Sequence, residues 1–131
     1  MNNLPWGVAS YNKRTTGNTT ITTASTDIAG ATGTFTAVTG RAYKVTFTGN
    51  FATSTGQVCY LRVFSGGSSI YEFLLTGVGG YRIITVSTIV TGLSAGSNTL
   101  KMVGQTDTGT VTVLGTAGNP SSFIIEDIGA A

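Results

Sequence analysis

The chain has 131 residues, a length typical of one domain that buries its own core without disulfides or metals. Charged residues make up 9% of it, against about 25% in an average soluble domain, and the net charge is +2. The few Lys and Arg residues are spread thinly, which argues against nucleic acid or a membrane as a partner.

The composition favours an all-β fold. The sequence contains 25 Thr and 19 Gly, together with many Val, Ile, Phe and Tyr residues. Thr and Val are stiff at χ1 and suit pleated sheets, whereas Gly supplies the turns between strands. No window shows a sustained apolar period of 3.6 residues, so helices are not expected.

The chain begins with a non-helical lead-in, Leu4-Pro5-Trp6-Gly7, because Pro5 lacks a backbone N–H. Trp6 fits three roles: a core plug, a cap over one end of the fold, or an anchor to a neighbour. Residues 8–11 then predict a first strand, which we expect to be buried.

A threonine-rich segment follows over residues 15–31. It is too polar for a central position, so it predicts an edge strand near Ile21 and then a loop with Ile28 turned inward. The clearest strand is 41–51, where Tyr43, Val45 and Phe47 alternate with polar residues.

Residues 57–76 predict a hairpin around the Gly66-Gly67 turn. Both of its faces are apolar, which indicates either the middle of the fold or an interface. Cys59 alternates with apolar neighbours on one face and is expected to be a small buried hydrophobe.

Three further strands are expected over 81–91, 97–105 and 110–114, and a last one over 121–128. Phe123 and Ile125 share one face of that last strand, and Ile124 and Ile128 share the other. An apolar pattern on both faces is typical of a strand covered on both sides.

These elements predict an antiparallel β-sandwich with a jelly-roll-like arrangement of about nine strands. We expect a single domain over residues 1–131 with a short lead-in at 1–7. The start of the chain has neither the basic nor the apolar region of a signal peptide, and no apolar stretch approaches a membrane span.

The residues predict no enzyme, cofactor or metal. The chain has no His, no partner to activate Cys59, and no serine in a nucleophile elbow. Glu126 and Asp127 are adjacent on a strand, so their carboxylates point to opposite faces and cannot act as a pair. Asp107 lies in an expected turn, where a solvated acid is commoner than a calcium ligand.

Three stretches carry a family resemblance: Leu4-Pro5-Trp6-Gly7, Gly40-Arg41-Ala42-Tyr43-Lys44-Val45 and the ending Asn119–Gly129. Together they resemble small β-sandwich virion proteins of tailed bacteriophages. Those proteins commonly open with a Pro-Trp-Gly lead-in and close with Asn-Pro, an apolar run and Glu-Asp-Ile-Gly. They occur as capsid decoration or minor capsid proteins and as domains of minor tail proteins.

The resemblance implies a homotrimer that binds the major capsid protein on the outer surface of the head, after synthesis in the host cytoplasm. The isolated module favours decoration of the head over a tail fibre. The alternative is a tail-tip or fibre module that binds a receptor or glycan through aromatic platforms such as Tyr11, Tyr71 or Tyr81. Candidate subunit or capsid contacts are Trp6, Tyr60, Arg62, Phe64, Ile124 and Ile128.

Overall fold

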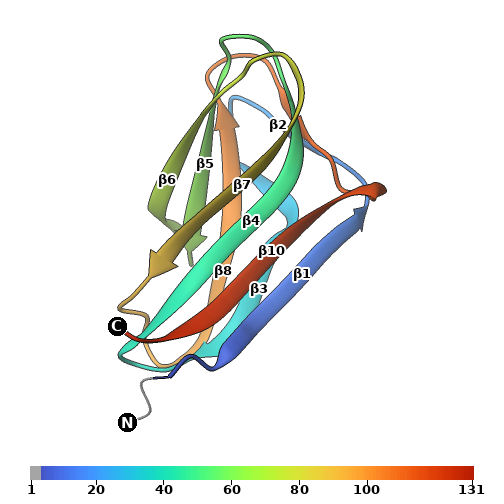
Figure 1. Cartoon of the computed structure of the whole chain (residues 1–131). Helices are drawn as coiled ribbons and strands as arrows, with labels where there is room; N and C mark the ends of the chain where they lie inside the picture. Colours follow the sequence, from blue (N-terminus) through green and yellow to red (C-terminus); the bar gives the residue numbers. More distant parts are fainter. Residues whose placement is uncertain (1–3) are drawn as a thin grey trace.

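A computed structural model describes residues 4–131 as two antiparallel sheets packed face to face (Figure 1). The strands are β1 (Gly7–Thr16), β2 (Thr19–Ile21), β3 (Thr26–Ala37), β4 (Arg41–Thr53), β5 (Val58–Ser65), β6 (Ser68–Thr76), β7 (Gly80–Val90), β8 (Gly96–Thr106), β9 (Val111–Val113) and β10 (Thr116–Ala130). The predicted jelly-roll-like sandwich is confirmed, with ten strands where the sequence indicated about nine.

The larger sheet has six strands in the order β1-β10-β4-β9-β2, and β7 pairs with β4. The smaller sheet has four strands in the order β3-β8-β5-β6. Strand β1 lies against β3 at one side of the sandwich, so β7 and β6 form its other side. This arrangement leaves β6 and β7 as the end strands of their sheets.

The core lies between the sheets and is built by period-2 alternation. In β4, Tyr43, Val45 and Phe47 are at most 1% exposed, as their alternation with polar residues predicted. They belong to the same buried cluster as Leu61 of β5 and Met102 of β8.

The last strand, β10, lies between β1 and β4 in the larger sheet. Phe123 and Ile125 are fully buried in the core, while Ile124 and Ile128 are half-buried on the outward face. The strand is therefore interior to its sheet, but only one of its faces is covered by the second sheet.

Strand β1 corrects an expectation, because it is a largely exposed edge strand and not a buried one. Its apolar residues Val8 and Tyr11 pair with Glu126 and Ile124, so they point outward with those residues. The core-facing positions of β1 instead carry small or polar side chains such as Ser10.

Two other predictions need correction. The edge strand at Ile21 is confirmed as β2, but the expected loop before residue 31 belongs to β3, since Thr26 and Asp27 pair with β8. In the hairpin, β5 is interior but β6 ends its sheet, so β6 is not in the middle of the fold.

Candidate functional site

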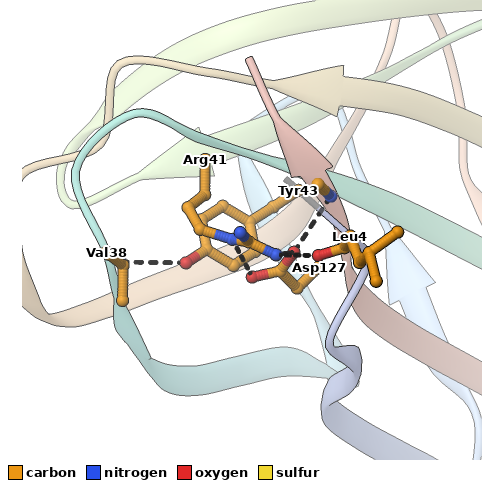
Figure 2. Close-up of polar contacts among 6 residues, drawn as sticks. Leu4, Val38, Arg41, Tyr43 and Asp127 are labelled. Atoms are coloured by element: carbon orange, nitrogen blue, oxygen red, sulfur yellow. Dashed lines mark hydrogen bonds and ion pairs between the residues drawn. The ribbon is translucent and has the colours of Figure 1, made fainter. Parts of the chain in front are cut away.

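A buried ion pair joins the three stretches that carry the family resemblance. The Arg41 side chain is 0% exposed and forms a two-bond contact with Asp127 of β10. Its Nε donates to Oδ2 at 2.7 Å and its Nη2 donates to Oδ1 at 2.6 Å. The same Nη2 also donates to the backbone carbonyl of Leu4 in the lead-in (Figure 2).

Trp6 completes this cluster. The Arg41 guanidinium lies 3.6 Å from the centre of the Trp6 ring, a stacked cation–π arrangement. Trp6 itself remains 53% exposed, so it is not a core plug. It caps the buried pair at the end of the sandwich.

The hydrogen bonds around the ion pair favour the charged forms of both Asp127 and Arg41. Hydrogen bonding from Arg41 lowers the pKa of Asp127 and outweighs burial, which acts to raise it; the Gly129 N–H, 3.0 Å from Oδ1, lowers it further. The hydrogen bond to Asp127 raises the pKa of Arg41 above its already high usual value. The carboxylate is thus fully used as an acceptor, and we assign the cluster the role of a clamp between the lead-in and β10.

A second group of predicted contact residues lies on the outward face of the smaller sheet. Arg62 donates to Glu72 at 2.6 Å and to Gln105 at 2.7 Å, and its guanidinium lies 5.2 Å from the Tyr60 ring centre. Phe64 sits on the same face, with the Lys101 ammonium 5.9 Å from its ring centre. This face presents aromatic and polar side chains, because Tyr60, Arg62 and Phe64 are all half-buried there.

The predicted contact residues do not form one site. Ile124 and Ile128 are half-buried on the outward face of the larger sheet, on the opposite side of the sandwich from Tyr60. Trp6 lies at the end of the fold, in the clamp. The structure therefore separates them into three surfaces.

The sequence did not reveal where the exposed apolar residues gather. The eleven large hydrophobic residues exposed in the described chain fall into two runs. We call the first the N-terminal apolar surface; its members are Leu4, Trp6, Val8 and Tyr11. We call the second the open edge, and it comprises Ile70, Tyr71, Leu74, Val78, Tyr81, Ile83 and Ile89 of β6, β7 and their connection. These side chains do not share one face: Leu74 pairs with Tyr60 on the outward side of the smaller sheet, whereas Ile83 and Ile89 face outward from the larger sheet.

The pattern that could have identified the open edge was present in the sequence. Residues 70–76 and 81–90 are apolar on both faces, which normally indicates cover on both sides. In the fold they are end strands, and a groove of about 400 Å³ lies there, lined by Ile70, Tyr71 and Ile89 with Val90 and Leu93.

Two further polar side chains, Gln57 and Asp107, have structural partners. Gln57 is buried beside a hollow of about 380 Å³; its amide nitrogen donates to the carbonyls of Thr108 and Thr110, and its amide oxygen accepts from the Ser54 N–H. The Asp107 carboxylate accepts from the Val58 N–H at 3.0 Å.

Chemically reactive groups do not gather in the described residues. Residues 4–131 contain no cluster of three His, Cys, Asp or Glu residues that could hold a metal ion. Cys59 is 1% exposed, and burial raises the pKa of its thiol to about 11. The expectation of a small buried residue at this position is confirmed.

Comparison with known proteins identifies the fold. No family model and no curated protein matches the sequence. The chain is similar to the solved structure of Eiger TNF from S. frugiperda, with a TM-score of 0.56 and 9% identity over 95% of this chain and 94% of that one. Identity this low shows a shared β-sandwich architecture alone.

Two weaker likenesses have lower TM-scores. Dimeric latent PorU from Porphyromonas gingivalis gives 0.39 at 13% identity, covering 95% of this chain and 13% of that chain. A CBM4 structure gives 0.32 at 12% identity, covering 93% of this chain and 94% of that one. In the part of the chain that the structure describes, no helix is long and apolar enough to cross a membrane.

Proposed function

We propose that this chain is a structural virion protein of a tailed phage, which binds the outer surface of the head as a homotrimer and stabilises the shell. One observation carries the proposal. The three stretches that resemble small phage β-sandwich proteins are far apart in the sequence, yet all three contribute to the clamp around Arg41 and Asp127. Residues that match such proteins thus build one structural unit.

The mechanism is multivalent adhesion to the major capsid protein. A rigid trimer places three copies of one modest contact surface at fixed spacing, so only a lattice with matching spacing engages all three. A chain with 9% charged residues adheres through apolar and backbone contacts more than through long-range attraction.

The outward face of the smaller sheet is our candidate for the surface that contacts the head. Tyr60, Arg62 and Phe64 present aromatic and guanidinium groups there, the residue types that dominate binding energy at protein interfaces. The contacts of Arg62 with Tyr60 and Glu72 hold its guanidinium in place before binding, which reduces the entropy lost on association.

The test is to add purified protein to heads that lack decoration and to measure bound protein after sedimentation. We expect saturable binding at a fixed number of copies per head. Replacing Tyr60 with Ser should weaken binding by at least about tenfold. A Lys44→Ser control, exposed on the opposite sheet, should bind normally. Failure of the wild-type protein to bind heads would overturn the proposal.

The second candidate function is a tail-tip or fibre module that binds a host receptor or glycan. Tyr11, Tyr71 and Tyr81 favour it, because they are 58%, 48% and 70% exposed and aromatic faces stack on sugar rings. Binding to host cells or glycans, with none to heads, would select this function.

A further inference from the structure

In the described part of the chain, five strands end the two sheets: β1, β2, β3, β6 and β7. An end strand exposes a row of backbone N–H and C=O groups, with which the strand of another chain can pair. Natural sheets guard such edges with short strands, bulges, proline or charged side chains. The five end strands of this fold differ in how well they are guarded.

Four of the end strands carry a protective feature. Strand β2 is three residues long, and β1 has two register shifts together with Lys13 and Arg14. The pairing of β3 with β8 is interrupted between Asp27 and Thr32. Strand β6 has a register shift in its pairing with β5, and Glu72 lies at its centre. Two antiparallel copies of β6 in full overlap would place their Glu72 carboxylates opposite each other, which is a repulsive contact.

Strand β7 has none of these features. It is 11 residues long, and its pairing with β4 runs from Gly80 opposite Thr53 to Val90 opposite Tyr43 without a register shift. It contains no proline, and its one charged residue, Arg82, lies near its start. Among the described residues β7 pairs with β4 alone, so its other edge is free (Figure 1). This edge is long, regular and unguarded.

We infer that the free edge of β7 pairs antiparallel with the β7 strand of a second copy, across a two-fold axis at Thr85. Thr85 is the middle residue of the strand, so this register overlaps the two strands in full. The pairing supplies about ten backbone hydrogen bonds and joins the two larger sheets into one. The inference goes beyond the proposed function, because the pair needs no trimer; where a trimer forms, the same contact joins two trimers.

The outward side chains of β7 favour a second copy as the partner, because the strand is complementary to itself in this register. The exposed Tyr81 of one copy lies opposite the exposed Ile89 of the other, and the exposed Ile83 lies diagonal to that Ile89. Thr85 lies opposite its own copy, so that two hydroxyl groups meet on the axis. Apolar groups thus meet apolar groups at both ends of the pair, and polar groups meet at its centre.

The core-facing side chains and the charge fit the same register. Ile84 and Val86 pack against the core and are half-buried. They lie opposite each other in the pair, which extends the apolar core from one copy to the next. Arg82 lies opposite Thr88, and the two copies of Arg82 are about 20 Å apart along the strands. At that distance physiological salt screens their repulsion.

The first test places a lysine on the axis. Thr85→Lys sets two like charges opposite each other at the free edge. Thr48→Lys is the matched control, because Thr48 lies on the same face one strand further in and its replacement removes the same Thr48–Thr85 hydrogen bond. Sedimentation velocity should show a dimer, or a hexamer where the trimer also forms, for the wild type and the control. Thr85→Lys should raise the dissociation constant of the pair at least about tenfold.

The second test uses disulfides to measure the register. Directly opposite residues of an antiparallel pair have Cβ atoms about 5 Å apart, which is close to the disulfide distance. Thr85→Cys should therefore form a covalent dimer with diamide as the oxidant. Ser87→Cys should not, since its copy lies about 14 Å away along the strands, but it should link to Ile83→Cys when the two are mixed. The wild type is the control for the native thiol of Cys59, which is 1% exposed.

The folding of each variant is checked by circular dichroism and melting temperature. Ser87→Lys, which is also exposed on β7, replaces Thr85→Lys if that variant does not fold.

Three results would overturn the inference: a wild type that forms neither dimer nor hexamer at micromolar concentration, a Thr85→Lys variant that pairs as tightly as the wild type, or a Ser87→Cys variant that links to itself as readily as Thr85→Cys. Equal weakening by Thr48→Lys and Thr85→Lys would place the contact on the face of the larger sheet, and would also overturn it. Head binding is measured separately. A protein that pairs through β7 but ignores heads would refute the proposed function alone.

Discussion

At the scale of single residues, Asp127 ties together segments that are far apart in the sequence. Its carboxylate neutralises a fully buried guanidinium, and through Arg41 it holds the lead-in at Leu4. A buried pair of this kind adds little net stability, because both charges lose their hydration, but removing one partner leaves the other uncompensated. The clamp therefore specifies how the lead-in docks.

We predict that Asp127→Asn lowers the melting temperature at pH 7 by about 10 °C, because Arg41 keeps its charge without a counter-ion. The folded-state pKa of Asp127 is below its unfolded value. Its stabilising contribution is therefore complete above the unfolded pKa of about 3.9 and is lost as the pH falls towards the folded pKa.

Thermal unfolding followed by circular dichroism between neutral and acid pH checks this prediction. The difference in melting temperature between wild type and Asp127→Asn should shrink below about pH 4. Glu126→Gln, one residue earlier and facing outward, is the matched control and should change little. A difference that stays constant across the pH range would contradict the prediction.

At the scale of elements, the connection between β6 and β7 is fixed to the turn between β4 and β5. The Gly77 N–H donates to the Gln57 carbonyl at 2.7 Å, and the Gly77 carbonyl accepts from the Gly56 N–H at 2.9 Å. A Cβ at position 77 would collide with the backbone carbonyl of Ser54 and lie 2.9 Å from the Cβ of Thr53. Backbone atoms cannot move aside as a flexible side chain can.

We predict that Gly77→Ala destabilises the fold by about 1–3 kcal/mol through this overpacking. Gly67→Ala is the control, since a Cβ there meets nothing within 4 Å, and its effect should stay within about 0.5 kcal/mol. Urea unfolding of the two variants and the wild type measures both values. Equal stabilities for the two variants would show that the turn adjusts freely.

The alternation of apolar and polar residues along a strand predicts some features of these elements and not others. The core face of β4 followed directly from the alternation of Tyr43, Val45 and Phe47 with polar residues. The same reasoning left β6 open between the middle of the fold and an interface, because two apolar faces are equally consistent with a strand inside a sheet and with an end strand that exposes its apolar residues. Strand order depends on pairings distant in sequence, which local pattern does not contain.

The sequence predicted only those parts of the candidate surfaces that depend on local alternation and not on strand order. Tyr60, Arg62 and Phe64 share a strand face, so their proximity followed from period 2. The contact between Arg41 and Asp127 joins residues 86 positions apart, and no local pattern predicts it. To predict the open edge, one would have to know that β6 and β7 end their sheets on the same side of the sandwich.

At the scale of the whole molecule, the low charge bears on the homotrimer that we propose. The exposed large hydrophobic residues are uncharged, so a contact that they form between copies leaves little for counter-ions to screen. We predict that the dissociation constant of the trimer changes by less than about threefold between low and high NaCl. Sedimentation velocity across a salt series measures it. A tenfold weakening at high salt would indicate an interface formed by charged pairs.

The corner at Gly40 and Arg41 holds both ends of the described chain. Arg41 binds the Leu4 carbonyl, and the Gly40 carbonyl accepts the Ala131 N–H at 2.8 Å. The fold is thus nearly a closed loop in space, with its ends tied to one turn. A short linker between them would make the chain suitable for circular permutation, with new termini at the exposed Gly66-Gly67 turn. In such a permuted chain the clamp would lie within a continuous segment, and the order of synthesis of the two sheets would change while their pairing stayed the same.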